Sequence, residues 1–253
     1  MISLILTIHN QEAIIQEVLS GIFSHYSSLC KEIIIVFDGC DDNSEKFTRN
    51  FMYKNFPQFP VTYQVTDNLF ETKANNVALR LATQPYAIII QDDCLIQERA
   101  FDVRLIKPML FWGDLFAVTG RDAHDVKVLE SGLVEYPNVA DKARDFVHVR
   151  QVVNRGPLAL KMEVVRAFDY LDETFYPQNG DDHDLCLRAA TQGWHCGSYP
   201  IFFMSDPSWG GTRKGDGRWI ADATHKNMRI LNNRYSIFLQ AYNPMEERWN
   251  NDC

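Results

Sequence analysis

The chain has 253 residues, and its 46% hydrophobic content is enough to fill the core of one large α/β domain or two small ones. Its 25 basic and 33 acidic side chains give a formal charge of −8, which argues against a dedicated nucleic-acid binder because such a protein carries a basic face. No apolar run approaches the roughly 20 residues of a membrane-spanning helix, and Met1–Ser3 lack the basic start of a signal peptide, so we expect a soluble, cytoplasmic protein.

In the first half of the chain, short apolar runs alternate with segments of helical spacing. The Val- and Ile-rich runs lack polar alternation, which predicts strands buried on both faces of a parallel sheet. These runs are Ser3–Ile8, Glu32–Phe37, Val61–Thr66 and Tyr86–Ile90. Apolar stripes of helical spacing lie between them, within Ala13–Ile22, Phe47–Met52 and Ala74–Ala82. This order predicts βαβ units with right-handed crossovers and an open α/β sheet.

After Phe116 the pattern loosens, and residues 120–145 are polar and only weakly periodic. Apolar patterning then predicts strands and helices in turn. They are a strand over Val147–Val153, a strand running into a helix over Leu158–Phe168, a helix over Asp181–Gln192, a strand over Tyr199–Met204 and a helix over Trp219–Tyr242. Trp209–Gly217 combines glycines with Arg213 and Lys214, which indicates either a mobile loop that closes on an anionic ligand or an exposed basic loop.

The six cysteines are dispersed and include no Cys-x-x-Cys pair. A chain with a sizeable core needs no covalent staples, so reduced thiols are expected instead of disulfides or a zinc site. The nearest histidine and cysteine grouping matches no common zinc module, and packing explains it equally well. That grouping consists of His183, Cys186, His195 and Cys196.

Polar and mostly acidic residues follow each of the four predicted first-half strands. They are His9-Asn10, Asp38–Asp42, Asp67-Asn68 and Gln91–Asp93. Ligands of such sheets bind at the carboxyl ends of the strands, so these residues are expected to meet at one site. The chain has neither the dinucleotide fingerprint nor a P-loop. A phosphorylated ligand would therefore need its charge met by a metal held on these carboxylates.

The adjacent carboxylates Asp92 and Asp93 directly follow a predicted buried strand. Like charges repel and burial penalises ionisation, so a divalent cation would resolve the conflict. Hard oxygen ligands suit Mg²⁺ or Mn²⁺, and a diphosphate can complete the coordination shell. The alternative is a pair of exposed loop aspartates.

Two other acidic segments each allow two interpretations. Asp38 could accept hydrogen bonds from a nucleobase or cap a helix, a role that Asp41, Asp42 or Ser44 could fill equally well. We favour a ligand for Asp38 and a cap from a later residue. The cluster Asp181–Asp184 begins a predicted helix, where the dipole favours acidic residues, so capping explains Asp181 and Asp184.

Taken together, these stretches resemble glycosyltransferase family 2, the inverting nucleotide-sugar transferases with the GT-A fold. The segments that carry the resemblance are Ile2–Asn10, Glu32–Asp42, Lys73–Ala82, Gln91–Asp93, Gly156–Leu160, Leu171–Phe175 and Asp181–Arg188. The chain departs from the family pattern at Phe37, which replaces an aspartate, at Cys40, which replaces a serine, and at Cys94, which occupies the place of the last aspartate of the D-x-D motif.

The resemblance implies a single GT-A domain over residues 1–253, an open mixed sheet flanked by helices with a C-terminal helical extension. Residues 1–118 would bind the nucleotide sugar, 119–218 the acceptor, and 219–253 would form the extension. The implied activity is a hexosyl- or deoxyhexosyltransferase that uses a nucleoside-diphosphate sugar and a hydroxyl of a glycan or other acceptor. Such a domain leaves no room for a separate membrane or carbohydrate-binding module.

The resemblance also implies roles for individual residues. Asp182 aligns with the general base, which acts from the face opposite the leaving diphosphate and so inverts the configuration. Asp93 would bind the metal, with Asp92 nearer the ribose. Thr7, His9 and Asp38 would hold the nucleoside, and Lys73 a base or phosphate edge.

Six positions in the second half complete this set of implied roles. Asp206, or the more distant His225, would take the place of a later metal ligand. Arg213 and Lys214 would cover the diphosphate when their loop closes. Trp209 and Trp219 would stack on acceptor sugars or, as aromatics more often do, pack in the core.

Two competing functions share the same sheet. A sugar-phosphate nucleotidyltransferase would have a glycine-rich N-terminal loop, which residues 9–12 do not provide. A catalytically inactive nucleotide-sugar-binding module is supported by Cys94 and opposed by the presence of Asp38, Asp92, Asp93 and Asp182.

Overall fold

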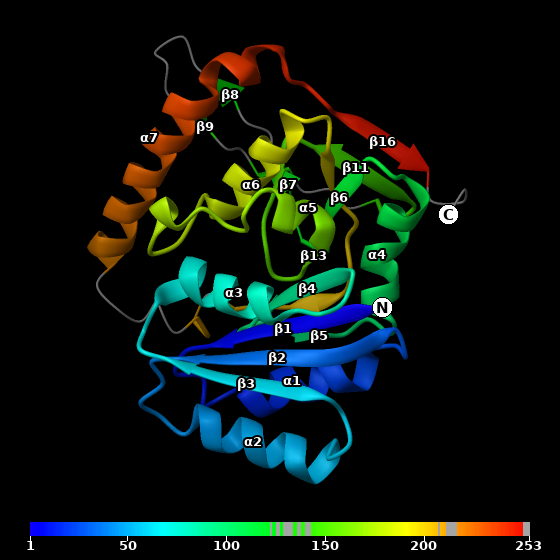
Figure 1. The fold of residues 1–253 in the computed structure, drawn as a ribbon, viewed down its shortest axis with the longest axis vertical. Helices are drawn as coiled ribbons and strands as arrows, with labels where there is room; N and C mark the ends of the chain where they lie inside the picture. The colour runs from blue at the N-terminus through cyan, green and yellow to red at the C-terminus, as the bar shows by residue number, and fades with distance from the viewer. Residues whose placement is uncertain are drawn as a thin grey trace.

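The computed structural model describes residues 1–121, 123–124, 127–128, 134–135, 138–139, 143–206, 208–210 and 217–249. A nine-stranded sheet with strand order β16-β11-β14-β6-β13-β4-β1-β2-β3 runs through the molecule (Figure 1). Its strands are β1 (Ile2–Ile8), β2 (Cys30–Asp38), β3 (Val61–Thr66), β4 (Tyr86–Gln91), β6 (Leu115–Thr119), β11 (Phe146–Arg150), β13 (Leu158–Lys161), β14 (His195–Ser198) and β16 (Glu246–Trp249).

The sheet is mixed. Strands β3, β2, β1 and β4 are parallel, as predicted. The expected burial on both faces holds for β1, β2 and β4 but is wrong for β3, which lies at the edge of the sheet and has no buried residue. Strand β13 is antiparallel to both of its neighbours, β4 and β6, and β11 pairs antiparallel with β14 and β16. The carboxyl ends of β1, β2 and β4 therefore meet at one edge of the parallel part, where the sequence places its polar residues.

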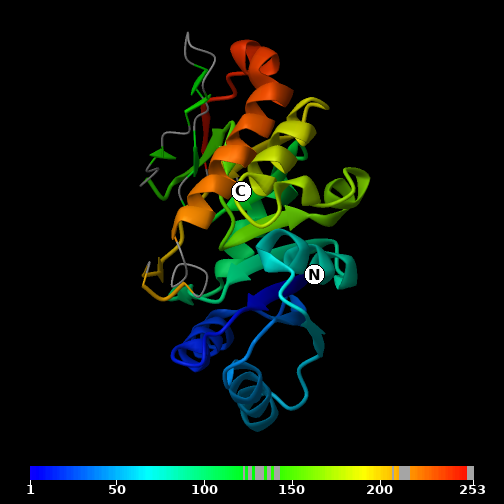
Figure 2. The ribbon, with the colours of Figure 1, turned by 90° about the vertical axis from the view of Figure 1, so that its left-hand side faces the viewer.

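Helices cover both faces of the sheet (Figure 1). One core lies between the sheet and α1 (Ile15–His25), α2 (Ser44–Asn55) and α4 (Phe101–Phe111). The other lies between the sheet and α3 (Phe70–Leu81), α5 (Met162–Ala167), α6 (Asp181–Ala190) and α7 (Gly217–Ala241). Figure 2 shows the long α7 alongside α6. Neighbouring residues of β1 serve opposite cores, since Leu4 and Leu6 face the first and Ile5 the second.

Shorter elements complete the fold. A 3₁₀ helix, η1 (Glu173–Phe175), precedes α6. One small sheet joins β10 (Asn138–Val139), β7 (Ala123–His124) and β12 (Val152–Val153), a second joins β15 (Phe203–Met204) to β5 (Leu95–Ile96), and a third joins β8 (Lys127–Val128) to β9 (Val134–Glu135). Within the described residues, no helix is both long enough and apolar enough to cross a lipid bilayer.

Two second-half predictions need correction. The expected strand over Val147–Val153 is two strands in different sheets, β11 and β12, separated at Gln151. The expected strand over Tyr199–Met204 is confined to β15, and the neighbour of β6 in the main sheet is the preceding β14. Strand β14 escaped prediction because it contains small residues: a Cβ at Gly197 would lie 2.9 Å from the carbonyl oxygen of His148.

Candidate active site

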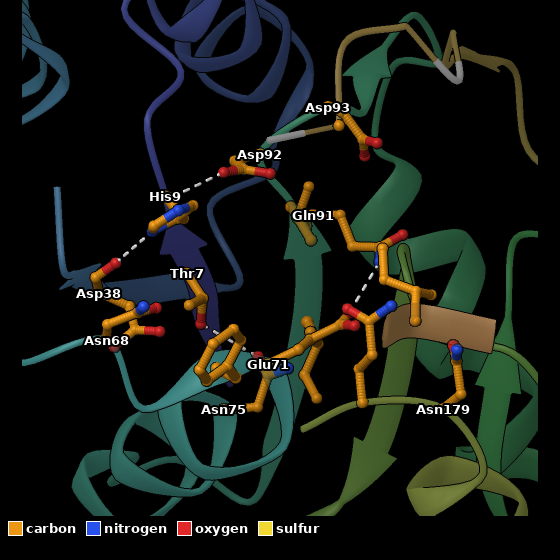
Figure 3. A pocket seen from close by; sticks show the side chains of 16 residues that line it. Thr7, His9, Asp38, Asn68, Glu71, Asn75, Gln91, Asp92, Asp93 and Asn179 are labelled. Carbon is orange, nitrogen blue, oxygen red and sulfur yellow. Dashed lines mark hydrogen bonds between the residues drawn. The ribbon is translucent and has the colours of Figure 1, made fainter. Parts of the chain in front are cut away.

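A cavity of about 330 Å³ opens at the carboxyl ends of β1, β2 and β4 (Figure 3). The lining residues come from the ends of these strands, the start of α3, the segment before α6 and the first turn of α7. They are Thr7, His9, Asp38, Asn68, Phe70, Glu71, Asn75, Ile89, Ile90, Gln91, Asp92, Asp93, Gln178, Asn179, Gly210 and Ile220. Five of the predicted site residues, Thr7, His9, Asp38, Asp92 and Asp93, thus line one cavity.

Asp38, at the end of β2, is 2% exposed. Its Oδ1 accepts hydrogen bonds from Thr66 Oγ1 at 2.8 Å and from the backbone N–H of Leu69 at 2.5 Å, which ties β2 to the entrance of α3. Its carbonyl oxygen lies 2.6 Å from His9 Nδ1. At the start of α2 it is Asp42, one residue before the N-cap Asn43, whose Oδ1 accepts from the N–H of Ser44 at 2.9 Å.

The end of β1 is held by two further contacts, both visible in Figure 3. Thr7 Oγ1 donates to Asn75 Oδ1 at 3.1 Å, and the His9 N–H donates to Asp92 Oδ2 at 2.9 Å. Three neighbouring segments therefore fix one another around the cavity: the ends of β1 and β4 and the first turns of α3.

Asp92 and Asp93 form the acidic part of the cavity wall. The pKa of Asp92 is raised to about 7, chiefly by burial and also by the neighbouring charges of Asp93 and Glu71, against the lowering effect of the His9 N–H. Asp93 is 6% exposed, and its buried Oδ1 has no hydrogen-bond partner. A desolvated carboxylate oxygen without a donor is a suitable ligand for a hard cation, so these residues fit a divalent metal.

Among the residues that the structure describes, no three His, Cys, Asp or Glu side chains cluster closely enough to hold an ion, so no third side chain of these types lies beside this pair. Asp206 is exposed, and its Oδ1 accepts from the Ser208 N–H at 2.8 Å; His225 is exposed on α7. Neither lines the cavity. Cys94 is fully buried in the core, and burial raises the pKa of its thiol to about 12, so residue 94 packs in the core as a neutral thiol.

Behind the cavity lies a buried ionic network centred on Arg155, which is 5% exposed. Its guanidinium donates two hydrogen bonds of 2.5 Å to the carboxylate of Asp181, and its Nε lies 3.1 Å from Glu71 Oε1. Glu71 Oε1 also accepts from Gln91 Nε2 at 2.9 Å (Figure 3). Burial raises the pKa of Glu71, although Arg155 opposes the rise. Arg155 thus joins the cavity wall to the start of α6.

Asp182, the candidate base, belongs to this network and is 7% exposed. Its two oxygens accept from the backbone N–H groups of Arg155, at 3.1 Å, and His183, at 2.9 Å. Burial alone would raise the pKa of Asp182, but the charge of Arg155, followed by that of His183 and the two N–H donors, lowers it below the ordinary value. Asp182 does not itself line the cavity but contacts it through Arg155 and Glu71.

The capping interpretation of Asp181 and Asp184 is wrong. The N-cap of α6 is Gly180, at φ 88°, which has no side chain with which to cap the helix. Asp181 is the partner of Arg155, and Asp184 accepts hydrogen bonds from Arg188 on its own helix and from Arg234 and Tyr235 on α7. Their carboxylates join separate segments of the fold.

Of the remaining predicted residues, Lys73, Trp209 and Trp219 do not line the cavity. Lys73 Nζ is 4.7 Å from the ring centroid of Tyr176. The carbonyl oxygen of Trp209 accepts from Gln11 Nε2 at 2.5 Å, and Trp219 is 43% exposed. Arg213 and Lys214 lie outside the described residues.

Several residues of the site were not predicted. Asn68 belongs to the strand-end residues expected at the site, and it does line the cavity. Glu71 and Asn75 were not expected there, and a position in a helix's first turns is the signal that could have identified them. Arg155, Phe70 and Asn179 carry no local signal, because their neighbours in space are far away in sequence.

No curated protein sequence matches the chain. The family described as Glycosyl transferase family 2 matches residues 3–157, more than half of the chain. GalNAc-T7, solved with UDP, GalNAc and Mn²⁺, has a TM-score of 0.65 at 11% identity over 78% of this chain and 42% of that one.

Two further solved structures are similar. The mannosyltransferase PcManGT from Pyrobaculum calidifontis, in complex with GDP-Man and Mn²⁺, has a TM-score of 0.60 at 17% identity over 79% of this chain and 54% of its own. S. aureus TarS 1–349 in complex with UDP has a TM-score of 0.55 at 14% identity over 82% and 61%. This chain therefore spans about half the length of these proteins. The likeness confirms the expected fold, an open mixed GT-A sheet flanked by helices with a C-terminal helix.

Proposed function

This chain belongs to glycosyl transferase family 2, and on that premise we propose that it moves a hexosyl or deoxyhexosyl group from a nucleoside-diphosphate sugar to a hydroxyl of a glycan or other acceptor, with inversion. The observation that carries the proposal is the cavity itself, where Asp38, Asp92 and Asp93 meet at the carboxyl edge of the sheet. Residues 1–118 would bind the donor and 119–218 the acceptor. The similar structures with UDP or GDP-Man support a nucleoside diphosphate as the ligand.

The nucleoside would lie against the ends of β1 and β2. Asp38 is held rigidly by Thr66 and Leu69, yet it still lines the cavity, so its remaining acceptor capacity is available to a base N–H. Thr7 and His9 flank it on β1. We assign Asp92 to the ribose side, and Lys73 and Arg213 to the edge of the nucleotide and the diphosphate.

Asp93, with Asp92 beside it, would hold Mn²⁺ or Mg²⁺, as the Mn²⁺ in two similar structures supports. When bound, the cation supplies charge stabilisation for the leaving diphosphate. Asp206 is proposed as an additional ligand. Metal-dependent donor affinity that is unchanged in Asp206→Ala would remove it from the site.

Asp182 is proposed as the general base. Its lowered pKa keeps the carboxylate ionised at neutral pH and therefore ready to accept the proton of an acceptor hydroxyl. The two backbone N–H donors fix its orientation, and each carboxylate oxygen keeps a second acceptor site for that hydroxyl. A base on the face of the sugar opposite the diphosphate gives inversion.

The test is a donor-hydrolysis screen across UDP-, GDP- and other nucleotide sugars, with and without Mn²⁺, because slow hydrolysis needs no known acceptor. We expect one nucleotide class to be hydrolysed in a metal-dependent way, with loss of metal-dependent donor binding in Asp93→Ala. Asp41→Ala is the matched control, since Asp41 is exposed at the same edge of the sheet. Donor binding without turnover would leave a nucleotide-sugar-binding module, and no metal-dependent binding of any donor would refute the enzyme assignment.

A further inference from the structure

Glu71, the second residue of α3, lies where the cavity meets the buried network around Arg155. It lines the cavity, and its side chain is 24% exposed. Its Oε1 accepts a hydrogen bond from Gln91 Nε2 at 2.9 Å (Figure 3) and lies 3.1 Å from Arg155 Nε. One carboxylate oxygen therefore holds two side chains that come from different segments of the fold.

Both of these side chains act on the main chain at residues 155 and 156. Arg155 belongs to this segment, and its own backbone N–H donates to Asp182 Oδ2 at 3.1 Å. Gln91 packs directly against the next residue, since a Cβ at Gly156 would lie 2.6 Å from Gln91 Cγ. Gly156, at φ 76°, thus lies against an amide that Glu71 itself orients. Glu71 therefore reaches the Arg155 backbone by two routes.

Charge neutralisation does not account for Glu71. Asp181 already pairs with the Arg155 guanidinium through two hydrogen bonds, and Asp182 adds a second negative charge to the network. Burial raises the pKa of Glu71, as do the charges of both aspartates, so its ionised form costs folding free energy although Arg155 opposes the rise. A third carboxylate that costs stability beside a candidate site indicates a role in function.

The orientation of Asp182 depends on the segment that Glu71 holds. Of the two backbone donors to its carboxylate, the His183 N–H belongs to α6 itself, whereas the Arg155 N–H comes from outside that helix. The Arg155 donor is thus the contact that fixes the carboxylate relative to the cavity wall. A general base must lie within hydrogen-bond reach of the proton that it takes, so a small shift of this donor would misplace it.

We propose that Glu71 is a positioning residue for the candidate base: by holding Arg155 and Gln91, it fixes the peptide whose N–H orients Asp182. The inference rests on the proposed function, which names the base, and adds a residue that acts on that base from the cavity wall. Glu71 takes no proton and binds no donor in this role, so its loss should slow turnover without weakening donor binding.

The test compares Glu71→Ala with Glu71→Gln in the full chain with Mn²⁺ and UDP-glucose, UDP-GlcNAc or GDP-mannose, whichever the wild type hydrolyses fastest. Glu71→Ala should lower the kcat of donor hydrolysis by about 10–100-fold, while the dissociation constant of the donor stays unchanged. Glu71→Gln keeps an oxygen that can accept from both Gln91 and Arg155, so it should restore most of the rate.

Glu163→Ala is the matched control, because Glu163 is likewise the second residue of a helix, in the first turn of α5, and lies outside the cavity lining. It should hydrolyse the donor as the wild type does. Weaker donor binding in Glu71→Ala would make Glu71 a donor ligand and overturn the inference. An unchanged kcat in Glu71→Ala, or no recovery in Glu71→Gln, would overturn it as well.

Amide hydrogen exchange gives a readout that needs no turnover. Glu71→Ala should speed exchange of the Arg155 N–H about tenfold or more, the factor that two lost hydrogen bonds of ordinary strength give. The N–H of Ile5, fully buried in β1, should exchange as in the wild type, which shows that the fold is intact. Unchanged exchange at Arg155 would overturn the inference. If the wild type hydrolyses no donor, the proposed function fails, whereas faster exchange at Arg155 still supports the link from Glu71 to Asp182.

Discussion

Replacing Arg155 by methionine should sharply destabilise the fold, because it leaves a buried carboxylate without its counter-ion. Asp181 is fully buried and accepts two short hydrogen bonds from the Arg155 guanidinium. Two charge-assisted hydrogen bonds of about 1.5–3 kcal/mol each give about 3–6 kcal/mol, which agrees with the roughly 3–5 kcal/mol lost when one partner of a buried pair is removed. Methionine keeps most of the aliphatic volume, so a packing defect adds little.

That loss is a large part of the total stability of about 5–15 kcal/mol expected for a domain. Urea unfolding at pH 7 should show it as a midpoint lowered by about 1 M or more, taking an m-value of about 3 kcal/mol/M. Arg49→Met is the control. Arg49 forms an exposed pair with Glu45 at 2.7 Å and lies over the Tyr63 ring, so its loss should cost about 1 kcal/mol or less.

The pH dependence gives a second readout. The pKa of Glu71 is raised by burial and opposed by Arg155; without Arg155 it should rise further. A carboxyl group whose pKa is raised in the folded state destabilises the fold as the pH rises through that pKa. The loss of unfolding free energy in Arg155→Met should therefore be smaller at pH 5 than at pH 8. Adding Asp181→Asn should recover part of the loss. A deficit no larger than that of Arg49→Met, or one independent of pH, would refute the account of this network.

Three further predictions concern the site and the sheet edge. Asp182→Asn should lower donor turnover by about 10²–10⁴-fold with metal-dependent donor affinity retained, and unchanged turnover would eliminate Asp182 as the base. Gly39→Ala should lower the thermal-unfolding midpoint more than Gly193→Ala. Both glycines have positive φ, so alanine costs about 1–2 kcal/mol at either position, but only at residue 39 would the new Cβ also lie 2.6 Å from Asn68 Cβ. Equal losses in the two variants would contradict this. Hydrogen bonding to Arg248 holds the pKa of Asp114 below its usual range, so Asp114→Asn should cost up to about 1 kcal/mol at neutral pH after screening. That difference in unfolding free energy should disappear as the pH falls below about 3.9 and through the lower folded-state pKa of Asp114. A constant difference down to pH 2 would rule out a stabilising Asp114–Arg248 interaction.

The parallel half of the fold was predictable because burial on both faces leaves a local signature. The residues of β1, β2 and β4 are continuous apolar runs, and the polar residues that end them, such as Asp38 and Asp92, had to meet at one edge. The second half lacked that signature. Strand β14 contains Gly197, which lets its backbone approach β11, and neither α4 nor β6 was predicted.

The residues of the site also differ in whether the sequence could predict them. Residues at strand ends could be found from the chain alone. Arg155 could not, because its partner Asp181 is 26 residues away and Glu71 lies on another element, and no local pattern reports such a pairing. Asp181 and Asp184 were misinterpreted for a related reason. Acidic residues in the first turn of a helix suit its dipole, but these two are buried and pair with Arg155 and Arg234, which are distant in the sequence.

The cavity wall includes Thr7 near the start of the chain and Ile220 near its end. A molecule bound there touches the first strand and the last helix together, so binding is thermodynamically linked to unfolding of the whole described fold. A nucleotide at 100 times its dissociation constant would add about 2.7 kcal/mol to the free energy of unfolding. The melting temperature of the protein can therefore rank nucleoside diphosphates and metal ions by affinity before any acceptor, product or rate is known.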